Sequence, residues 1–209
     1  MKKVIKYLLI VLVIVLVGYK SVYFEKLSEL KKATNQKFDA VAYSKRLWDQ
    51  KLPVKIDSAI ELRSLVKLIE ANPVDAFSKY SNAIGIGNYR YSLVKVTGTV
   101  AMINEDDIIM EVDHDDSLMK IKLATEYVYG NALRDASELV DIKDFINTTD
   151  LNNISEELNK SVRTTVLPVF KKQVKQGDKL EVTGAVEFNK EHVHFKDLEI
   201  IPARIKILK

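Results

Sequence analysis

Two five-residue segments far apart in the chain are near-copies of each other, and both have the pattern of a β-strand. They read Val-Thr-Gly-Thr-Val at 96–100 and Val-Thr-Gly-Ala-Val at 182–186. Apolar and polar residues alternate around each, which is the period of a strand with one buried face. A glycine in mid-strand lets the strand bend sharply, as the strands of a small barrel must. The sequence therefore predicts a small, strongly curved sheet.

The strand pattern recurs five times after residue 89, in the order strand, strand, strand, helix, strand, strand. The strands are predicted near residues 94–102, 108–112, 119–123, 180–188 and 192–208. The helix is predicted from apolar residues spaced four apart, Ile154, Leu158, Val162 and Val166. We expect Pro168 to kink or restart this helix, and a phase slip near 196–197 indicates a bulge. This order is that of an OB-fold, a five-stranded Greek-key barrel; another small antiparallel sheet with a helix packed on it is the alternative.

The residues before 89 have the spacing of helices. Helices are predicted over 40–52, 58–71 and 73–80. We expect Pro53 to stop the first, and Asn72 to cap the third. The predicted class is therefore α+β: a helical segment over 38–88 packed on an OB-fold-like barrel domain over 89–209, which has one main helix and an insert at 125–150.

The N-terminus carries an apolar run preceded by lysines. Residues 8–17 are all Leu, Ile or Val, after Lys2, Lys3 and Lys6. This is the pattern of an export signal, although the residues that follow make a poor cleavage site. A helix over 4–24 would be about 30 Å long, which matches a hydrocarbon core of about 30 Å. We predict an uncleaved signal-anchor over 1–24, a juxtamembrane stalk over 25–37 and a single-pass protein with its body outside the cell membrane; a cleaved signal peptide is the alternative.

The charges are divided unevenly along the chain. The net charge is +3, from 32 Lys and Arg and 29 Asp and Glu, and residues 1–24 hold four lysines and no acid. The body therefore has 28 basic residues against 29 acids, a net charge of −1. A nucleic-acid-binding domain needs a basic face to neutralise phosphates. We therefore expect no nucleic-acid partner.

Residues 130–136, which read Gly-Asn-Ala-Leu-Arg-Asp-Ala, resemble a bacterial family of predicted periplasmic lipoproteins, domain of unknown function 2291. Further segments carry the resemblance: Phe38-Asp39-Ala40, Leu47-Trp48, Asp144-Phe145 and Leu158-Asn159. The resemblance covers about residues 38–205, and the family is similar to OB-fold proteins in its strand pattern. Its members are often encoded beside sugar ABC transporter components. The resemblance therefore implies an accessory role near carbohydrate uptake, with a transporter component or a saccharide as the partner.

The sequence departs from this family where a lipid would be attached. Members carry Gly-Cys-Lys after the apolar run, whereas the matching residues here are Gly18-Tyr19-Lys20, and the chain has no cysteine. Tyrosine cannot take the lipid, so the lipoprotein label is not carried over, and the predicted anchor would replace the lipid. Without cysteine, disulfides, thiolate metal sites and thiol catalysis are also excluded.

Candidate ligand-binding residues lie in and around the 125–150 insert. Arg134 offers the planar set of donors that a guanidinium presents to carboxylates or sugar hydroxyls. The alternative is a structural pair in which Arg134 and Asp135 fix the insert over the barrel. The other candidates are polar residues suited to caps, turns or binding, and tyrosines suited to stacking on sugar rings or to cross-strand packing: Asn131, Asp144, Asn147, Asn159, Tyr127 and Tyr129, with Tyr89 and Tyr91 beside them.

No catalytic motif, metal site or cofactor is predicted. The glycines at 85 and 87 follow a helix rather than a strand, so they are not a dinucleotide fingerprint. His192 and His194 share one strand face but lack a third ligand. Residues 113–116 lack the spacing of an EF-hand loop and are expected to be a solvated hairpin tip.

Three functions stay open on the sequence. The favoured one is a non-enzymatic, membrane-anchored, extracytoplasmic OB-like module that binds a partner through residues 104–131, the second and third strands with their loops. The second is an extracytoplasmic hydrolase of saccharide or cell-wall substrates that uses Asp135 or Asp144 with Arg134. The third is a nucleic-acid-binding OB domain. The first is favoured because no catalytic constellation is identifiable.

Overall fold

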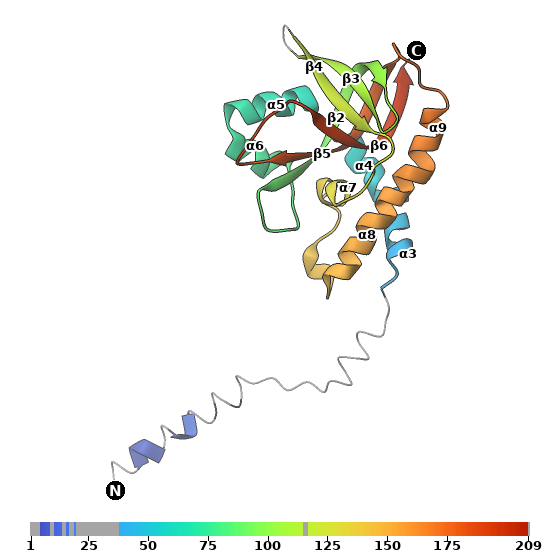
Figure 1. Ribbon diagram of the computed structural model, residues 1–209. Helices are drawn as coiled ribbons and strands as arrows, with labels where there is room; N and C mark the ends of the chain where they lie inside the picture. The colour runs from blue at the N-terminus through green and yellow to red at the C-terminus, as the bar shows by residue number, and fades with distance from the viewer. Residues whose placement is uncertain are drawn as a thin grey trace. The chain divides into compact units, whose positions relative to one another are not determined.

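The computed structural model describes residues 38–114 and 117–208, together with 5–8, 11–13, 16 and 19 (Figure 1). The chain divides into two units, Met1–Phe38 and Asp39–Lys209. Among the described residues, no helix is both long enough and apolar enough to cross a membrane. Most of the anchor predicted over 4–24, and all of the stalk predicted over 25–37, lie outside the described residues, so both stay predictions.

The described residues of the second unit form one sheet of six strands. These are β1 (Ile60–Glu61), β2 (Tyr89–Ile103), β3 (Asp107–His114), β4 (Ser117–Ala124), β5 (Lys179–Asn189) and β6 (Leu198–Leu208). Their order is β1-β2-β3-β4-β6-β5, and β5 also pairs with β2. The last five strands are therefore paired in a closed circuit, antiparallel except for β4 with β6. The predicted succession of three strands, a helix and two strands is confirmed.

The two mid-strand glycines, at which bends are predicted, lie where the strand pairing changes. Up to Thr99, β2 pairs with β5, and from Thr99 onward it pairs with β3, so the strand changes partner next to Gly98. The pairing of β5 with β6 shifts register between Thr183 and Gly184. The bulge expected at 196–197 is therefore misplaced: β6 begins only at Leu198, and the irregularity lies further along it, opposite Gly184.

The helices fall in two groups, one before β2 and one between β4 and β5. They are α3 (Ala40–Arg46), the π-helix η1 (Leu47–Lys51), α4 (Leu52–Asp57), α5 (Leu62–Ala71), α6 (Pro73–Tyr80), α7 (Ala132–Ala136), the 3₁₀-helix η2 (Ile142–Asp144), α8 (Thr148–Ser161), the π-helix η3 (Val162–Val166) and α9 (Leu167–Lys171). The third predicted helix is confirmed as α6, with the side chain of Asn72 accepting a hydrogen bond from the backbone of Asp75.

Two predictions about the first helices are wrong. Pro53 does not stop the chain's helical course, because the π-helix η1 precedes it and α4 continues to Asp57. A π-helical turn relaxes the spacing of the backbone hydrogen bonds, which accommodates the donor that proline lacks. The same arrangement occurs at Pro168, where the π-helix η3 is followed by α9. The helix therefore restarts at this proline, as predicted. Ile60 and Glu61, predicted as helix, form β1 and pair with β2 in parallel.

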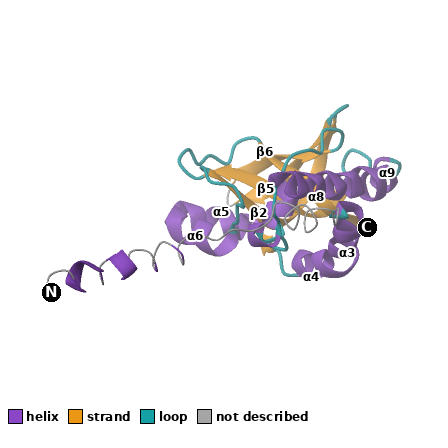
Figure 2. Cartoon of the chain, turned by 90° about the horizontal axis from the view of Figure 1, so that it is seen from below, coloured by secondary structure: helices purple, strands orange, loops and turns teal. Residues whose placement is uncertain are grey.

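The helices cover the sheet from two sides. α8 and α9 run in line, with α3 beside α8, while α5 and α6 lie against β2 (Figures 1 and 2). The short helix α7 contacts β2, β5 and α8. The largest fully buried side chains come from sheet and helices alike: Leu62, Leu65, Val66, Val94, Ile108, Met110, Ile121, Leu123, Leu133, Ile154, Leu180 and Ile200. Leu133 is the one among them that belongs to α7, and its burial anchors that short helix in the core.

Candidate functional site

Arg134 and Asp135 are neighbours on α7, and both are almost completely buried, with 5% and 2% of their surface exposed. The Nε of Arg134 donates to Oδ1 of Asp135 at 2.7 Å, and its Nη1 donates to the carbonyl oxygen of Leu151 in α8 at 3.1 Å. The other carboxylate oxygen of Asp135 accepts a hydrogen bond from the backbone N–H of Ile84 at 3.1 Å. The pair therefore ties α7 to α8 and to the loop before β2.

The backbone around the pair is held equally firmly. The side-chain amide of Asn82 donates to the carbonyl oxygen of Asp135 at 3.0 Å, and the hydroxyl of Ser137 donates to that of Arg134 at 2.7 Å. A buried ion pair is best tolerated when its remaining polar atoms are hydrogen-bonded as well, and here Nη1 of Arg134 and both oxygens of Asp135 are. This arrangement is the one expected of the structural alternative, and it fixes the insert against the sheet.

A cavity of about 240 Å³ lies beside this pair, and we call it the Arg134 cavity. It is lined by residues 83–87, Tyr89, Tyr91, Asn131, Arg134, Asp135, Ile142, Thr148, Leu151 and Asn152. Arg134 uses Nε and Nη1 in the contacts above, and among the described residues no acceptor takes a hydrogen bond from its Nη2. The cavity thus has a charged donor in its wall, two tyrosine rings, and polar side chains from α8.

Tyr91 stands in an unusual electrostatic environment at this cavity. Burial raises the pKa of its phenol well above the ordinary value, and the carboxylate of Glu187, which is hydrogen-bonded to it, raises that pKa further. Glu187 lies directly opposite Tyr91 in the β2–β5 pair. The charge of Asp135 acts in the same direction, while that of Arg134 opposes it. Tyr91 therefore stays a neutral hydrogen-bond donor through physiological pH.

We predict that Tyr91 makes the protein less stable at alkaline pH. The unfolded chain loses the phenol proton near pH 10, whereas the folded chain retains it, so the free energy of unfolding falls as pH rises above about 10, by up to about 1.4 kcal/mol per pH unit. Urea unfolding between pH 9 and 11.5 should show a shallower fall for Tyr91→Phe. Tyr127→Phe is the control, since this side chain is 62% exposed. Equal slopes for all three proteins would contradict the assignment.

Of the eight predicted site residues, three line the cavity: Asn131, Arg134 and Asp135. Asn131 also accepts a hydrogen bond through Oδ1 from Ser155 at 3.2 Å. Asn159 is buried and donates to the carbonyl oxygen of Gly130 at 2.9 Å, which supports the start of α7 from outside the cavity.

The remaining polar candidates, Asn147 and Asp144, lie outside the cavity lining. Asn147 caps α8, its Oδ1 accepting from the backbone N–H of Asp150 at 3.0 Å. Asp144 is exposed at the end of η2. Its charge raises the pKa of Tyr43, for which burial is the larger cause. Capping and turn chemistry therefore accounts for the place of both residues.

Tyr127 and Tyr129 do not join the cavity lining. They are 62% and 59% exposed and follow the end of β4, so they do not take part in cross-strand packing. The guanidinium carbon of Arg163 lies 5.1 Å from the centre of the Tyr129 ring. Tyr129 lines a separate cavity of about 290 Å³ together with His192 and His194. In the part of the chain that the structure describes, no group of three or more His, Asp or Glu side chains is placed to hold a metal ion.

Sequence reasoning missed Thr148 and Asn152 of α8 and the loop around Gly85 and Gly87 as parts of the cavity. Asn152 belongs to no sequence motif, and the sequence does not distinguish it from the other polar residues of the predicted helix. Tyr89 and Tyr91 were expected only as part of a tyrosine surface. In the structure Tyr89 and Tyr91 line the Arg134 cavity, whereas Tyr129 lines a different one.

The family described as Predicted periplasmic lipoprotein (DUF2291) matches residues 12–206. The chain belongs to this family. Its membership confirms the resemblance carried by residues 130–136 and points to an extracytoplasmic, membrane-associated protein. The family's lipid attachment has no cysteine acceptor among these 209 residues.

The fold agrees with that of a solved OB-fold protein. The crystal structure of an OB-fold protein from Thermotoga maritima superposes with a TM-score of 0.72 at 24% sequence identity, covering 83% of this chain and 100% of that one. An OBody bound to hen egg-white lysozyme (17% identity, 56% of this chain and 80% of that one) and the Schizosaccharomyces pombe Stn1–Ten1 complex (13%, 56% and 58%) reach TM-scores of only 0.27 and 0.25, which establish nothing further. A comparison with curated proteins found no match.

Proposed function

We propose that this protein is a non-enzymatic, extracytoplasmic OB-fold module that binds a neutral saccharide in the Arg134 cavity. The observation that carries the proposal is the buried guanidinium of Arg134, whose Nη2 has no acceptor among the described residues although Arg134 lines the cavity. A charged donor forms a strong hydrogen bond, so a ligand oxygen placed beside Nη2 would be firmly held.

The composition of the cavity favours an uncharged, hydroxylated ligand. The ion pair with Asp135 cancels the charge of Arg134, so no net charge attracts an anion. Thr148 and the amide of Asn152 can both donate and accept hydrogen bonds, as sugar hydroxyls require. Tyr89 and Tyr91 supply aromatic surface for the apolar face of a sugar ring. A volume of about 240 Å³ suits a ligand of about one ring.

The cavity lies beside the binding region that was predicted over 104–131. Only Asn131 belongs to both. The cavity is instead built from the start of β2, from α7 and from α8, so the ligand would contact the insert rather than the face of β3 and β4.

We retain two further parts of the proposal as predictions. Residues 4–24 form a single-pass anchor that holds the chain at the outer side of the cell membrane. The closed sheet is the OB-fold barrel of the body. The protein assists a sugar ABC transporter component. The wholly exposed Ile86, on the loop that lines the Arg134 cavity, offers an apolar contact for such a partner.

Binding is favoured over hydrolysis by the state of the two candidate acids. Both oxygens of Asp135 are engaged, by Arg134 and by Ile84, so neither is placed as a base or nucleophile. Asp144, the other candidate, lies outside the cavity lining. A hydrolase would need a free carboxylate facing the ligand, and among the described residues Asp135 is the one acid in the cavity lining.

Calorimetric titration of the purified full chain with a panel of neutral monosaccharides and disaccharides tests the proposal. We expect at least one sugar to bind and to be recovered unchanged, and Asn152→Ala to weaken its affinity about tenfold through the loss of one or two hydrogen bonds. Asn153→Ala is the matched control, because this neighbouring asparagine is also exposed but does not line the cavity. Failure of every sugar to bind, or equal affinities for the two variants, would contradict the proposal.

A further inference from the structure

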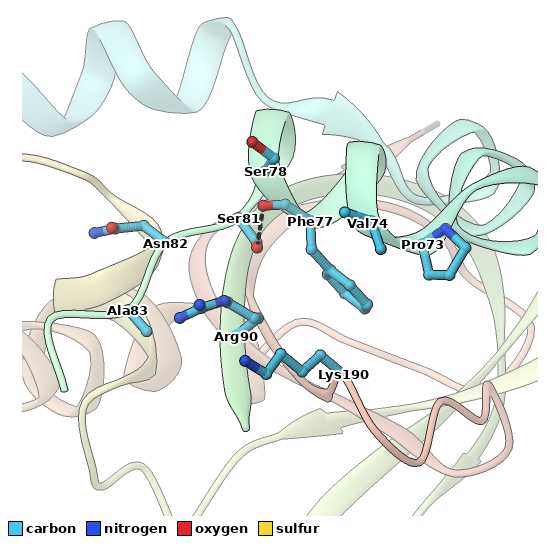
Figure 3. A pocket seen from close by; sticks show the side chains of 9 residues that line it. All are labelled: Pro73, Val74, Phe77, Ser78, Ser81, Asn82, Ala83, Arg90 and Lys190. Carbon is cyan, nitrogen blue, oxygen red and sulfur yellow. Dashed lines mark hydrogen bonds between the residues drawn. The ribbon is translucent and has the colours of Figure 1, made fainter. Parts of the chain in front are cut away.

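A second cavity, of about 550 Å³, lies between α6 and the paired ends of β2 and β5. Pro73, Val74, Phe77 and Ser78 of α6 form one wall, and Arg90 and Lys190 lie across from them (Figure 3). Ser81, Asn82 and Ala83 complete the lining, which contains no Asp or Glu among the described residues. We call it the Arg90 cavity. The described residues of its lining carry two positive charges and no negative one.

The strand register places both cations on the same face of the sheet. Arg90 lies directly opposite Phe188 in the β2–β5 pair, and Lys190 follows two residues after Phe188. The backbone N–H of Lys190 still donates to the carbonyl oxygen of Asn88 at 2.8 Å, so the pairing extends to this residue. Side chains two apart on a strand share a face, and diagonal neighbours across a pair are about 7–8 Å apart. The strand register therefore makes Arg90 and Lys190 diagonal neighbours on one face of the sheet.

Neither cation has an acidic partner among the described residues. By contrast, Lys79 of α6 pairs with Asp75 at 3.2 Å, and Lys95 further along β2 pairs with Glu61 at 3.2 Å. Like charges held close together on one face repel each other. An anion bound between Arg90 and Lys190 would remove this repulsion and would receive hydrogen bonds from both.

We propose that the Arg90 cavity is a binding site for a phosphomonoester. The two positive charges match the charge of about −1.5 to −2 that a phosphomonoester carries at pH 7. A guanidinium donates two parallel hydrogen bonds to a phosphate, and the ammonium of Lys190 adds a point charge. Ser78, whose hydroxyl has no partner among the described residues, adds a further donor at the α6 wall.

The size of the cavity indicates that the phosphate is attached to an organic group. The apolar wall of Pro73, Val74 and Phe77 would lie against that group. Phe77 is itself held in place by Phe188, the two ring centres being 5.9 Å apart. A soluble phosphate ester and a phosphatidate headgroup share this chemistry. The site is separate from the Arg134 cavity, so this inference does not rest on saccharide binding.

The test is a calorimetric titration of the full chain with glycerol 3-phosphate, with glycerol as the uncharged counterpart. We expect glycerol 3-phosphate to bind, glycerol not to bind, and Arg90→Gln/Lys190→Gln to weaken the affinity at least tenfold. Lys51→Gln/Lys172→Gln removes the same charge at two exposed positions away from the cavity, and should change the affinity less than twofold. Thermal unfolding of each variant checks that it is folded.

Vesicles distinguish the two sources of the phosphate. Vesicles of phosphatidylcholine with phosphatidate are compared with vesicles of phosphatidylcholine alone, for the native chain and both double variants. Capture by phosphatidate vesicles that requires Arg90 and Lys190 identifies a lipid headgroup, whereas binding of glycerol 3-phosphate without such capture identifies a soluble ester. Absence of both, or binding that both double variants weaken equally, overturns the proposal.

Discussion

Gly184→Ala is expected to destabilise the folded chain by about 3 kcal/mol or more, or to prevent folding, because the added methyl group meets backbone rather than a movable side chain. A Cβ at this position would lie 2.3 Å from the carbonyl oxygen of Ile201 and 2.7 Å from Cγ2 of Ile200. Both neighbours belong to β6, which pairs with β5 on one side and β4 on the other. Relief of the overlap would push β6 away from β5 and open the closed circuit of strands.

Urea unfolding of the purified variant measures this effect. Gly85→Ala is the matched control, because a Cβ there meets nothing within 4 Å. It should change the free energy of unfolding by no more than about 0.5 kcal/mol. Gly98→Ala should resemble Gly184→Ala, since its Cβ would lie 2.6 Å from the carbonyl oxygen of Glu111. A loss below about 1 kcal/mol for Gly184→Ala would mean that close strand approach is not what glycine supplies here.

Arg134→Ala is expected to destabilise the protein by about 3–5 kcal/mol, because it leaves the carboxylate of Asp135 buried without its counter-charge. The substitution also removes the donor to the carbonyl oxygen of Leu151, which holds α8 against α7. Breaking a buried pair on one side costs more than the pair itself contributes. Arg134→Met combined with Asp135→Asn should therefore recover part of the loss.

The control for this prediction is an exposed ion pair close by in the chain. Lys55 binds Glu138 at 2.8 Å, with side-chain exposures of 35% and 46%. Because water screens such a pair, Lys55→Ala should cost less than about 1 kcal/mol. Equal small losses for Arg134→Ala and Lys55→Ala would show that α7 does not depend on the buried pair. If Arg134→Ala and Asp135→Asn stayed fully stable but lost a hydrolytic activity, the enzymatic alternative would replace our proposal.

The closed sheet was largely predictable, since strand alternation and glycine position are local properties of the chain. Val96 to Val100 and Val182 to Val186 indicated two of the strands and the glycine in the middle of each. The failures were also local. The pattern before Glu61 favoured a helix, but pairing with β2 made a strand of Ile60 and Glu61, because sheet hydrogen bonds outweigh a weak helix propensity. The helix end predicted at Pro53 did not occur, because the π-helical turn before it lets the chain continue as α4.

The candidate site was predictable only as a cluster of residues around the insert. The sequence placed Arg134 and Asp135 together and suggested that they pair. The sequence contained no indication that the backbone N–H of Ile84 would donate to Asp135 or that the carbonyl oxygen of Leu151 would accept from Arg134. Nor did it indicate that Nη2 of Arg134 would lie beside a cavity without an acceptor among the described residues.

The amino-acid order by itself determined the strand succession and the family, because each depends on neighbours within a few residues or on a continuous motif. Tertiary structure alone decided which side chains share a cavity. Arg90 and Lys190 are 100 positions apart and line one cavity only because β2 pairs with β5, and Asn152 lines a cavity with Tyr89 only through the packing of α8 on α7. Such contacts depend on register and packing between distant segments, which no local period encodes.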